Sequence, residues 1–400
     1  MITVEEARNI INNHPGDFGE ETIHLHESIG RVLAEEIVAD RDFPPFDRVT
    51  MDGVAFNYAS YTSGRREFKL EGTSLAGESP KSLSDQNHAL EIMTGAVLAR
   101  GCDAVVRYED LEFFEKDGVK WVRVMDDHVF EWKNVHRQAN DGKQGDVLIP
   151  KEQEINSALI SILATVGKER VKVGKLPKMA VIATGDELVE VNETPLAHQI
   201  RKSNVVSIKV ELDKLGIENE LFHLNDDKGL ITDALKKILN EYDAVILSGG
   251  VSKGKVDHVP GVLEEMGVQK LFHRVAQRPG KPFWFGVFDN QKPVFAFPGN
   301  PISTYTCFKV YFQEWLDSSL KCPKKSRFAI LNEDFVFKPD LGYFLQVRTE
   351  YSSSGSVHVF PQTGNGSGDI ANLSKSDGIV LLPSGKEEYK KGTSYEYFPY

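Results

Sequence analysis

Apolar runs alternate with amphipathic segments through the middle of the chain. The apolar run at 178–188 ends in a Gly-Asp turn, the run at 243–250 ends in two glycines, and a third run lies at 218–224. Segments 203–216 and 227–242 carry apolar side chains every three or four positions, which predicts amphipathic helices. The resulting β-α-β-α-β order predicts a doubly wound, mostly parallel sheet with right-handed crossovers.

Residues 294–303, VFAFPGNPIS, predict a strand that turns sharply into a helix. Pro298 and Gly299 break the strand, Asn300 suits the N-cap, and Pro301 suits the first helical position. The helix is predicted to continue as far as Trp315. Its N-terminus would offer backbone N–H groups and a partial positive charge to an anion, although an ordinary strand-to-helix turn has the same pattern.

The regions on either side have different patterns. The first 174 residues mix predicted helices at 4–13, 27–36 and 157–166 with strands and turns, and 326–400 contains short β-like runs separated by turn residues. Thr3 and Glu6 form a predicted capping box, and Ser203 or Asn204 is the predicted cap of the 203–216 helix. We therefore expect four domains: a discontinuous first domain at 1–43 plus 138–174, a β-rich insertion at 44–137, the α/β domain at 175–322, and a small β domain at 323–400.

Composition restricts the class of protein. A chain of 400 residues exceeds one ordinary core, and 40% hydrophobic with 26% charged residues is typical of a globular protein. The net charge of −12 argues against general nucleic-acid binding, and no run of 18 apolar residues predicts a membrane span. The N-terminus is acidic and helical rather than a signal peptide, and the three scattered cysteines have no metal-site spacing. We expect a cytoplasmic protein.

Four loops fall at the ends of the predicted strands, where ligands bind in doubly wound sheets. They are residues 184–188 (TGDEL), 225–227 (NDD), 248–257 (SGGVSKGKVD) and 298–301 (PGNP). Each loop alone is typical of a turn, but together they would converge on one crevice. Glycines there would let the backbone approach a ligand closely.

Charged residues on and near these loops favour an anion held with a hard cation. Glu187, Asp226 and Asp257 are oxygen ligands of the kind that Mg²⁺ prefers, although Asp226 could instead cap the helix near 228 and Glu187 could be a solvated turn residue. Arg278 and Lys281, with the nearby Arg274, could bind phosphate or an oxyanion, or form a solvated rim.

Motifs in a fixed order connect the whole chain to one family. These are PPFDRVTMDGVA, IMTGA, GCDAVV, GDVLI, MAVIATGDEL, SNVVSI, ILSGGVSKGKVDHV, RPGKPFWFG and FPGNPIS. The sequence resembles the MoeA family, the molybdopterin molybdenumtransferases related to the E domain of gephyrin. The resemblance covers nearly the whole chain, is weakest in the last 75 residues, and implies that the α/β domain is MogA-like.

The resemblance implies an activity and a set of site residues. The family inserts molybdate into adenylylated molybdopterin with magnesium and releases AMP, and it forms homodimers whose active clefts are shared between subunits. Transient contact with other molybdenum-cofactor enzymes is also implied. The catalytic positions implied are Asp52, Thr94, Asp141, Glu187, Asp226 and Asp257, of which Glu187, Asp226 and Asp257 are metal candidates. The substrate-binding positions implied are Ser248, Gly249, Gly250, Ser252, Arg278, Lys281, Pro298, Gly299, Asn300, Pro301 and Ser367.

The sequence departs from the family pattern at two places, and two rival functions remain open. Val49-Thr50 replaces a small Ser-Ala pair, and Lys253 and Lys255 add positive charge to the Gly-Gly loop. A molybdopterin adenylyltransferase would share the TGDE, Gly-Gly and PGNP loops but would not need the flanking domains. A gephyrin-like scaffold is the non-catalytic alternative. An oxidoreductase is disfavoured because no Gly-x-Gly-x-x-Gly follows the first strand of the α/β domain.

Overall fold

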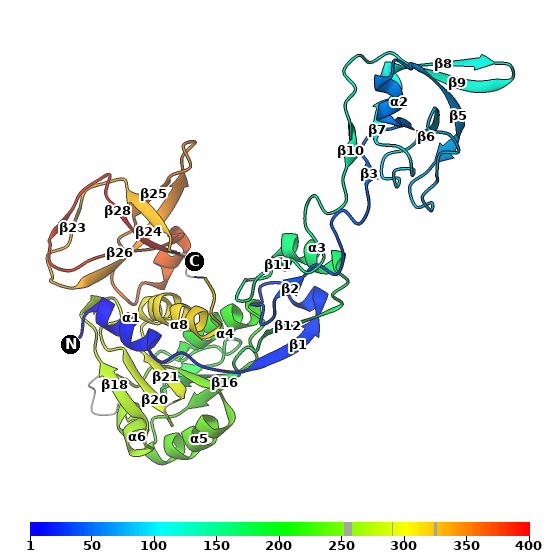
Figure 1. Ribbon diagram of the computed structural model, residues 1–400. Helices are drawn as coiled ribbons and strands as arrows, with labels where there is room; N and C mark the ends of the chain where they lie inside the picture. The colour runs from blue at the N-terminus through cyan, green and yellow to red at the C-terminus, as the bar shows by residue number, and fades with distance from the viewer. Residues whose placement is uncertain (252–257, 290, 324–325) are drawn as a thin grey trace. The chain divides into compact units, whose positions relative to one another are not determined.

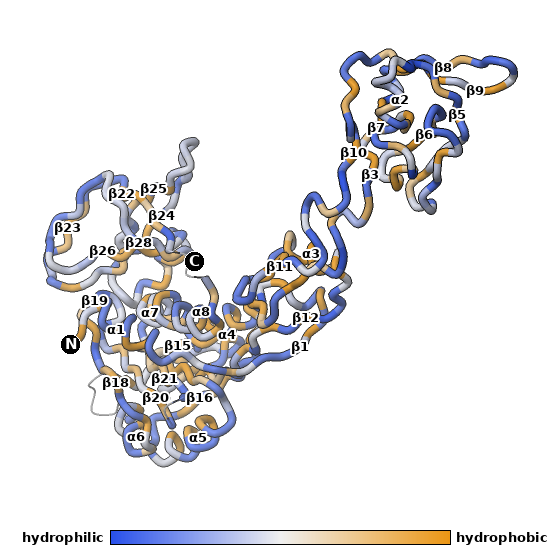
Figure 2. The backbone as a smooth tube through the Cα atoms, in the orientation of Figure 1, coloured by the Kyte–Doolittle hydropathy of each residue, from blue (hydrophilic) through white to orange (hydrophobic). Residues whose placement is uncertain are grey.

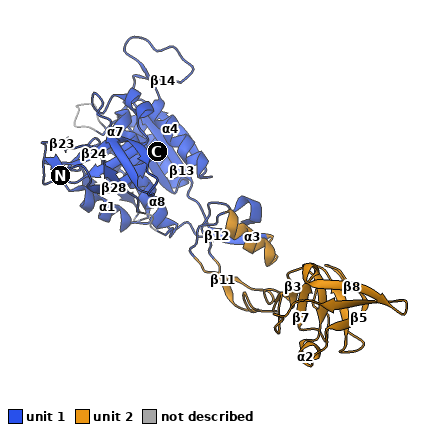
Figure 3. Ribbon diagram, turned by 90° about the horizontal axis from the view of Figure 1, so that it is seen from above, with its two compact units in different colours: residues 1–34, 152–156, 170–400 blue, residues 35–151, 157–169 orange. Residues whose placement is uncertain are grey.

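The computed structural model describes residues 1–251, 258–289, 291–323 and 326–400 (Figure 1). The chain forms two compact units, and each is considered by itself (Figure 3). The first unit comprises residues 1–34, 152–156 and 170–400, and the second comprises 35–151 and 157–169. The predicted four-domain division is finer than these two units and stays a prediction.

A six-stranded sheet forms the centre of the first unit. In spatial order its strands are β16 (Asn219–Leu224), β13 (Met179–Thr184), β17 (Ala244–Ser248), β21 (Lys292–Phe297), β20 (Trp284–Phe288) and β18 (Gln269–His273). The first four strands are parallel, and the last two pair antiparallel at one edge. The predicted mostly parallel sheet is therefore confirmed, with β18 as a strand that the sequence pattern did not indicate.

Helices cover both faces of this sheet because its strands are apolar on both sides. Val181 packs with one core cluster and Ile182 with the other, and orange segments gather around β20 and β21 in Figure 2. The first face is covered by α1 (Val4–Asn12), α4 (Ser203–Lys214), α7 (Pro301–Cys307), a π-helical turn (Phe308–Phe312) and α8 (Gln313–Ser319). The second face is covered by α5 (Lys228–Glu241) and α6 (Val259–Glu265). This arrangement is a doubly wound α/β fold.

The C-terminal residues of the first unit form a small closed barrel. Its strands are β24 (Gly342–Tyr351), β25 (Val357–Pro361), β22 (Phe328–Leu331), β28 (Ser394–Pro399) and β26 (Gly378–Leu382), and β26 pairs back with β24. β19 (Gln277–Arg278) adds to β24 from the α/β region. The five strands close on themselves, and β19 covers the edge that the first residues of β24 would otherwise present.

The second unit is built on its own six-stranded sheet. Its order is β7 (Ala104–Arg107), β4 (Gly53–Phe56), β6 (His88–Ile92), β5 (Glu67–Ser74), β9 (Val119–Val124) and β8 (Leu111–Lys116). Only the β5–β6 pair is parallel. Val54 and Ala55 enter different core clusters, so this sheet also buries both faces.

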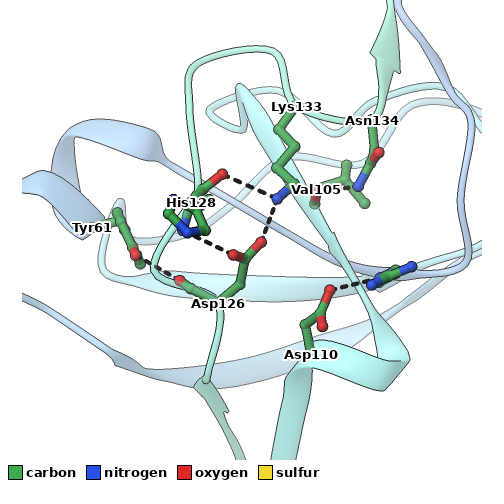
Figure 4. Close-up of polar contacts among 8 residues, drawn as sticks. Tyr61, Val105, Asp110, Asp126, His128, Lys133 and Asn134 are labelled. Carbon is green, nitrogen blue, oxygen red and sulfur yellow. Dashed lines mark hydrogen bonds and ion pairs between the residues drawn. The ribbon is translucent and has the colours of Figure 1, made fainter.

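A polar network holds the segment after β9 onto this sheet (Figure 4). The Asp126 carboxylate forms an ion pair with Lys133 and accepts a hydrogen bond from the His128 backbone amide at 2.8 Å. The Tyr61 hydroxyl donates to the Asp126 carbonyl at 2.7 Å. Burial opposes ionisation of Asp126, but the Lys133 and His128 contacts outweigh it and lower the pKa of the carboxyl group.

Shorter elements complete the two units. They are β1 (Glu20–His24), β2 (Ile37–Val38), β3 (Arg48–Val49), α2 (Tyr58–Thr62), β10 (Val135–His136), β11 (Val147–Ile149), α3 (Ser157–Thr165), β12 (Arg170–Gly174), β14 (Leu188–Val189), β15 (Ile200–Arg201), β23 (Phe335–Val336) and β27 (Glu388–Tyr389), with 3-10 turns at Leu25–Glu27, Tyr108–Asp110 and Ile370–Lys375. Within the described ranges, no helix combines the length and apolar content that crossing a membrane requires.

One predicted helix is wrong. Residues 27–36 do not form a helix, because Gly30 has a φ of 78° and the following backbone bonds to other segments. The Gly30 amide donates to Ile155 O at 2.7 Å, and the Leu33 amide donates to Gln153 O at 2.9 Å. The apolar residues at 27–36 belong to an irregular segment whose backbone bonds to other parts of the chain. The predicted Thr3–Glu6 capping box of α1 is confirmed.

We predict that Arg8 is a stability determinant of the first unit. From α1 its guanidinium reaches Glu314 on α8 at 2.6 Å and Glu396 on β28 at 2.6 Å, and all three side chains are mostly buried. Arg8→Ala would leave two carboxylates without their cation and should cost about 3–5 kcal/mol. Calorimetry should show a lower melting temperature. Arg348→Ala breaks an exposed pair and should cost under about 1 kcal/mol; equal shifts for both variants would contradict the prediction.

Candidate functional site

The carboxyl ends of β13, β17 and β21 border a cavity of about 430 Å³. Its lining comes from the turn after β13, the β15–α4 junction, the segment after β16, the Gly-Gly loop and the Pro-Gly-Asn-Pro turn. Nine of the predicted site residues line it together: Glu187, Asp226, Ser248, Gly249, Gly250, Pro298, Gly299, Asn300 and Pro301. The crevice therefore lies where a doubly wound sheet places its ligands.

The Gly-Gly loop approaches the end of β13 too closely for side chains. Gly249 has a φ of 101°, and a Cβ there would lie 2.7 Å from the Thr184 carbonyl oxygen. Gly250 has a φ of 66°, and its Cβ would lie 2.9 Å from the Thr184 hydroxyl. Only glycine fits both the backbone conformation and the space at these positions.

The Pro-Gly-Asn-Pro turn is held from two directions. Asn300 occupies the N-cap position of α7 as predicted, but its side chain makes no capping bond. Its Nδ2 instead donates to Ser367 Oγ at 2.8 Å, and the Ile302 amide donates to Ser367 O at 3.1 Å. The Thr304 hydroxyl donates to the Pro298 carbonyl at 2.6 Å. The predicted Ser367 therefore contacts the turn directly.

Two of the three predicted metal ligands lie at the cavity. Glu187 and Asp226 line it, and α5 is capped by the neighbouring Asp227, whose Oδ1 accepts from the Leu230 amide at 2.9 Å. Asp226 is therefore not the cap residue. Asp257 lies outside the described residues, as do Ser252, Lys253 and Lys255. Among described residues no three His, Cys, Asp or Glu side chains gather closely enough to hold a metal by themselves.

The predicted basic residues Arg278 and Lys281 do not line the cavity. Arg278 belongs to β19, and its guanidinium lies over the rings of Phe337 and Tyr343, 5.9 Å from each ring centroid. Pro282 lines the cavity, whereas Arg278 and Lys281 are not among its lining residues. Their contact with an anion stays a prediction.

Two other basic residues line the cavity, and sequence reasoning missed them. Arg201 and Lys202 lie at the β15–α4 junction. Arg201 Nε donates to the Glu193 carbonyl at 3.0 Å, and Lys202 forms an ion pair with Glu190. Their position directly before the SNVVSI motif was the signal that could have identified them.

Asn204 is a third residue with an unexpected position. Neither Ser203 nor Asn204 caps α4, because the N-cap position is Lys202 and no side-chain cap bond forms. Asn204 instead lines the cavity, and its Nδ2 contacts both Ser248 and Gly299. The cap prediction was wrong because α4 begins at Ser203, so Asn204 lies inside the first turn, where its amide nitrogen reaches the loops across the sheet end.

The second unit brings two predicted residues together. Asp52 Oδ1 accepts hydrogen bonds from the Thr94 amide and from the Thr94 hydroxyl, both at 2.7 Å. The amide bond is the larger cause, and the hydroxyl the second, of a lowered pKa for Asp52. Asp141 lies in the same unit and accepts from His136 Nε2 at 2.9 Å.

Comparisons with known proteins agree with this fold. Residues 2–167 match a family model described as MoeA N-terminal region (domain I and II), 180–318 match a probable molybdopterin binding domain, and 329–400 match the MoeA C-terminal region (domain IV). A solved MoeA protein of molybdopterin biosynthesis from Pyrococcus horikoshii has a TM-score of 0.82 at 28% identity, covering 100% of this chain and 99% of that chain.

Curated relatives match this chain over nearly the full length of both proteins. The molybdopterin molybdenumtransferase of Synechocystis is 41% identical over 400 residues, covering all of both chains. That of Staphylococcus epidermidis is 33% identical, covering 98% of this chain and 94% of the relative. The fold and the family models thus define a multidomain protein whose α/β domain is of the probable molybdopterin binding type. The chain belongs to the MoeA family of molybdopterin molybdenumtransferases.

We predict that Gly249→Ala distorts the cavity. The added Cβ would meet backbone atoms of Thr184 that cannot rotate away, and the positive φ adds strain, together about 1–3 kcal/mol. Thermal unfolding should show a lower melting temperature. Gly261→Ala is the control, because its Cβ meets nothing within 4 Å on α6 and should stabilise by up to about 1 kcal/mol. A Gly249→Ala protein as stable as the parent would contradict this geometry.

We predict that Thr94→Val raises the pKa of Asp52. Because the Thr94 hydrogen bonds lower the pKa of Asp52, they stabilise the fold fully at pH values above the ordinary pKa of an aspartate. This stabilisation is lost as the pH falls through the lowered pKa. Removing the hydroxyl should bring the pKa part of the way back, because the Thr94 amide still donates. Carbon NMR titration of labelled aspartates measures this. Thr62→Val, whose hydroxyl donates only to Ala59 O, should leave Asp52 unchanged; an unshifted Asp52 in Thr94→Val would refute the assignment.

Proposed function

We propose that this chain inserts molybdate into adenylylated molybdopterin, forming molybdenum cofactor and releasing AMP. The observation that carries the proposal is the cavity at the sheet end, which joins Glu187 and Asp226 to the Gly-Gly loop and the Pro-Gly-Asn-Pro turn. Family membership supplies the reaction class, because relatives that match the whole chain are molybdopterin molybdenumtransferases. In the proposed chemistry, two molybdate oxygens leave as water when the two dithiolene sulfurs bind molybdenum, with protons from the thiols and the solvent. Water hydrolyses the anhydride bond between the pterin phosphate and AMP.

The chain's own groups have distinct tasks in this reaction. Gly249 and Gly250 lack side chains and lie against the end of β13, and their exposed backbone is the proposed contact for the phosphates. Arg201 and Lys202 supply positive charge at the cavity, as the substrate anions require. Ser248 and the Pro298–Pro301 turn form another part of the lining, and Ser367 holds this turn through Asn300. Asp52, Thr94 and Asp141 keep catalytic roles in the proposal.

Magnesium fits the acidic residues of the cavity. Mg²⁺ binds through one or two protein carboxylates together with substrate phosphates and water. Glu187 and Asp226 provide two such carboxylates, and Asp257, outside the described residues, is the proposed third. When bound, the ion would neutralise charge on the phosphates. Without it, two carboxylates would repel an anionic substrate.

The proposal extends to assembly and location. We propose a cytoplasmic homodimer in which both chains contribute to each active cleft, with transient contacts to other enzymes of molybdenum-cofactor synthesis. Arg278 and Lys281 stay proposed anion-binding residues, and Ser252 stays a proposed substrate contact. Adenylyltransferase activity and a purely structural role are less favoured, because the whole-length relatives are molybdenumtransferases.

We predict AMP release that requires both an oxyanion and a divalent cation. Purified protein, adenylylated molybdopterin, molybdate and magnesium are combined, and AMP is measured by chromatography. Omitting molybdate or adding a chelator should abolish release. Consumption of ATP with free molybdopterin would identify the adenylyltransferase instead, and no nucleotide turnover under any condition would favour the scaffold.

Neighbouring aspartates provide a matched test of the metal site. Asp226→Asn removes a proposed ligand and should raise the magnesium concentration needed for half-maximal release by on the order of 10-fold or more. Asp227→Asn retains a good N-cap for α5 and should leave the magnesium dependence unchanged. Equal magnesium dependence in both variants would remove Asp226 from the metal site.

A further inference from the structure

One side-chain amide connects three segments at the edge of the cavity. Asn204, in the first turn of α4, has its Nδ2 2.9 Å from Ser248 Oγ at the end of β17 and 2.7 Å from the Gly299 carbonyl oxygen. The same nitrogen is 3.1 Å from Thr304 Oγ1 in α7. Ser248 and Thr304 are buried, whereas Asn204 is partly exposed and lines the cavity.

The chemistry of these partners fixes the orientation of the amide. A carbonyl oxygen only accepts hydrogen bonds, so the group facing Gly299 must be the amide nitrogen of Asn204. The Thr304 hydroxyl already donates to Pro298 O, so it accepts from Asn204. Two amide hydrogens therefore serve three acceptors. Within the described part of the chain, Asn204 Oδ1 makes no hydrogen bond of its own, which leaves one acceptor at the cavity.

We propose that Asn204 is a positioning residue for the transfer reaction. It holds the Ser248 hydroxyl and the Gly299 carbonyl in register across the sheet end, so that the loop after β17 and the Pro-Gly-Asn-Pro turn present one surface to the substrate anion. Its fixed Oδ1 adds an acceptor for an N–H or O–H group of the bound pterin nucleotide. The inference rests on the proposed function for its kinetic part and on geometry alone for its structural part.

The isosteric variant separates this role from simple space filling. Asn204→Asp keeps the side-chain volume but turns a carboxylate oxygen toward the Gly299 carbonyl, which repels it. Positioning predicts that Asn204→Asp is at least as harmful as Asn204→Ala, with kcat/KM for AMP release lowered about 10- to 100-fold in both. If the side chain only filled space, Asn204→Asp would be the milder variant.

Asn219 on β16 is a matched control. Its Nδ2 is also held by two acceptors, Asp213 Oδ1 at 2.7 Å and Ile217 O at 2.9 Å, and it does not line the cavity. Asn219→Ala should retain kcat/KM within about twofold of the parent. The melting temperature of Asn204→Ala should not fall much further than that of Asn219→Ala.

A double-mutant cycle tests whether Asn204 acts through Ser248. If the two side chains act as one unit, the effects of Asn204→Ala and Ser248→Ala on kcat/KM should be clearly less than multiplicative. Hydrogen exchange supplies a readout that does not depend on the reaction. Peptides covering residues 296–306 should exchange faster in Asn204→Ala but not in Asn219→Ala.

The outcomes separate the two proposals. If the parent protein releases no AMP, the proposed function fails, and faster exchange at 296–306 in Asn204→Ala still supports the structural part. If the parent releases AMP but Asn204→Ala retains parental kcat/KM, or the two effects multiply independently, the positioning role is overturned. Unchanged exchange at 296–306 overturns it as well.

Discussion

The close approach of the Gly-Gly loop to the end of β13 is the constraint on which the site depends. Gly249 lies against the Thr184 carbonyl at a distance that excludes any Cβ, and its amide donates to Phe297 O at 3.1 Å. The backbone of Gly249 thus lies close to the ends of both neighbouring strands, β13 and β21. A side chain at this position would separate β13 from β17 and occupy the space where phosphates are proposed to bind.

The charges around the cavity have a consistent physical explanation. Two carboxylates and a strongly anionic substrate cannot share a crevice unless a cation lies between them. Arg201 and Lys202 compensate part of this charge from the β15–α4 junction, but Lys202 is already paired with Glu190. Under the proposed function, a divalent metal that binds with the substrate would supply the remaining positive charge.

The α/β region was predictable because its hydrophobic pattern, its helix signals and its turn residues all indicate the same fold. Apolar strands, amphipathic helices and Gly-rich ends coincide in residues 178–250, and the structure places the expected loops at one sheet end. The segment 27–36 was not predictable, because its apolar spacing fits a helix while its backbone bonds go to distant residues such as Ile155. The spacing of apolar residues does not identify hydrogen-bond partners that lie far away in the chain. Asn204 was misassigned for the same reason, since an Asn at a helix start normally indicates a cap.

The link between the barrel and the cavity explains why the turn at Asn300 departs from helix-capping rules. A capping Asn would satisfy the first amides of α7 locally. Here Asn300 Nδ2 and the Ile302 amide both go to Ser367, which belongs to the C-terminal segment beside the barrel. The turn thus depends on a residue 67 positions away in the chain. A single α/β domain would lack this support, so the C-terminal segment contributes to the shape of the cavity and not only to the stability of the chain.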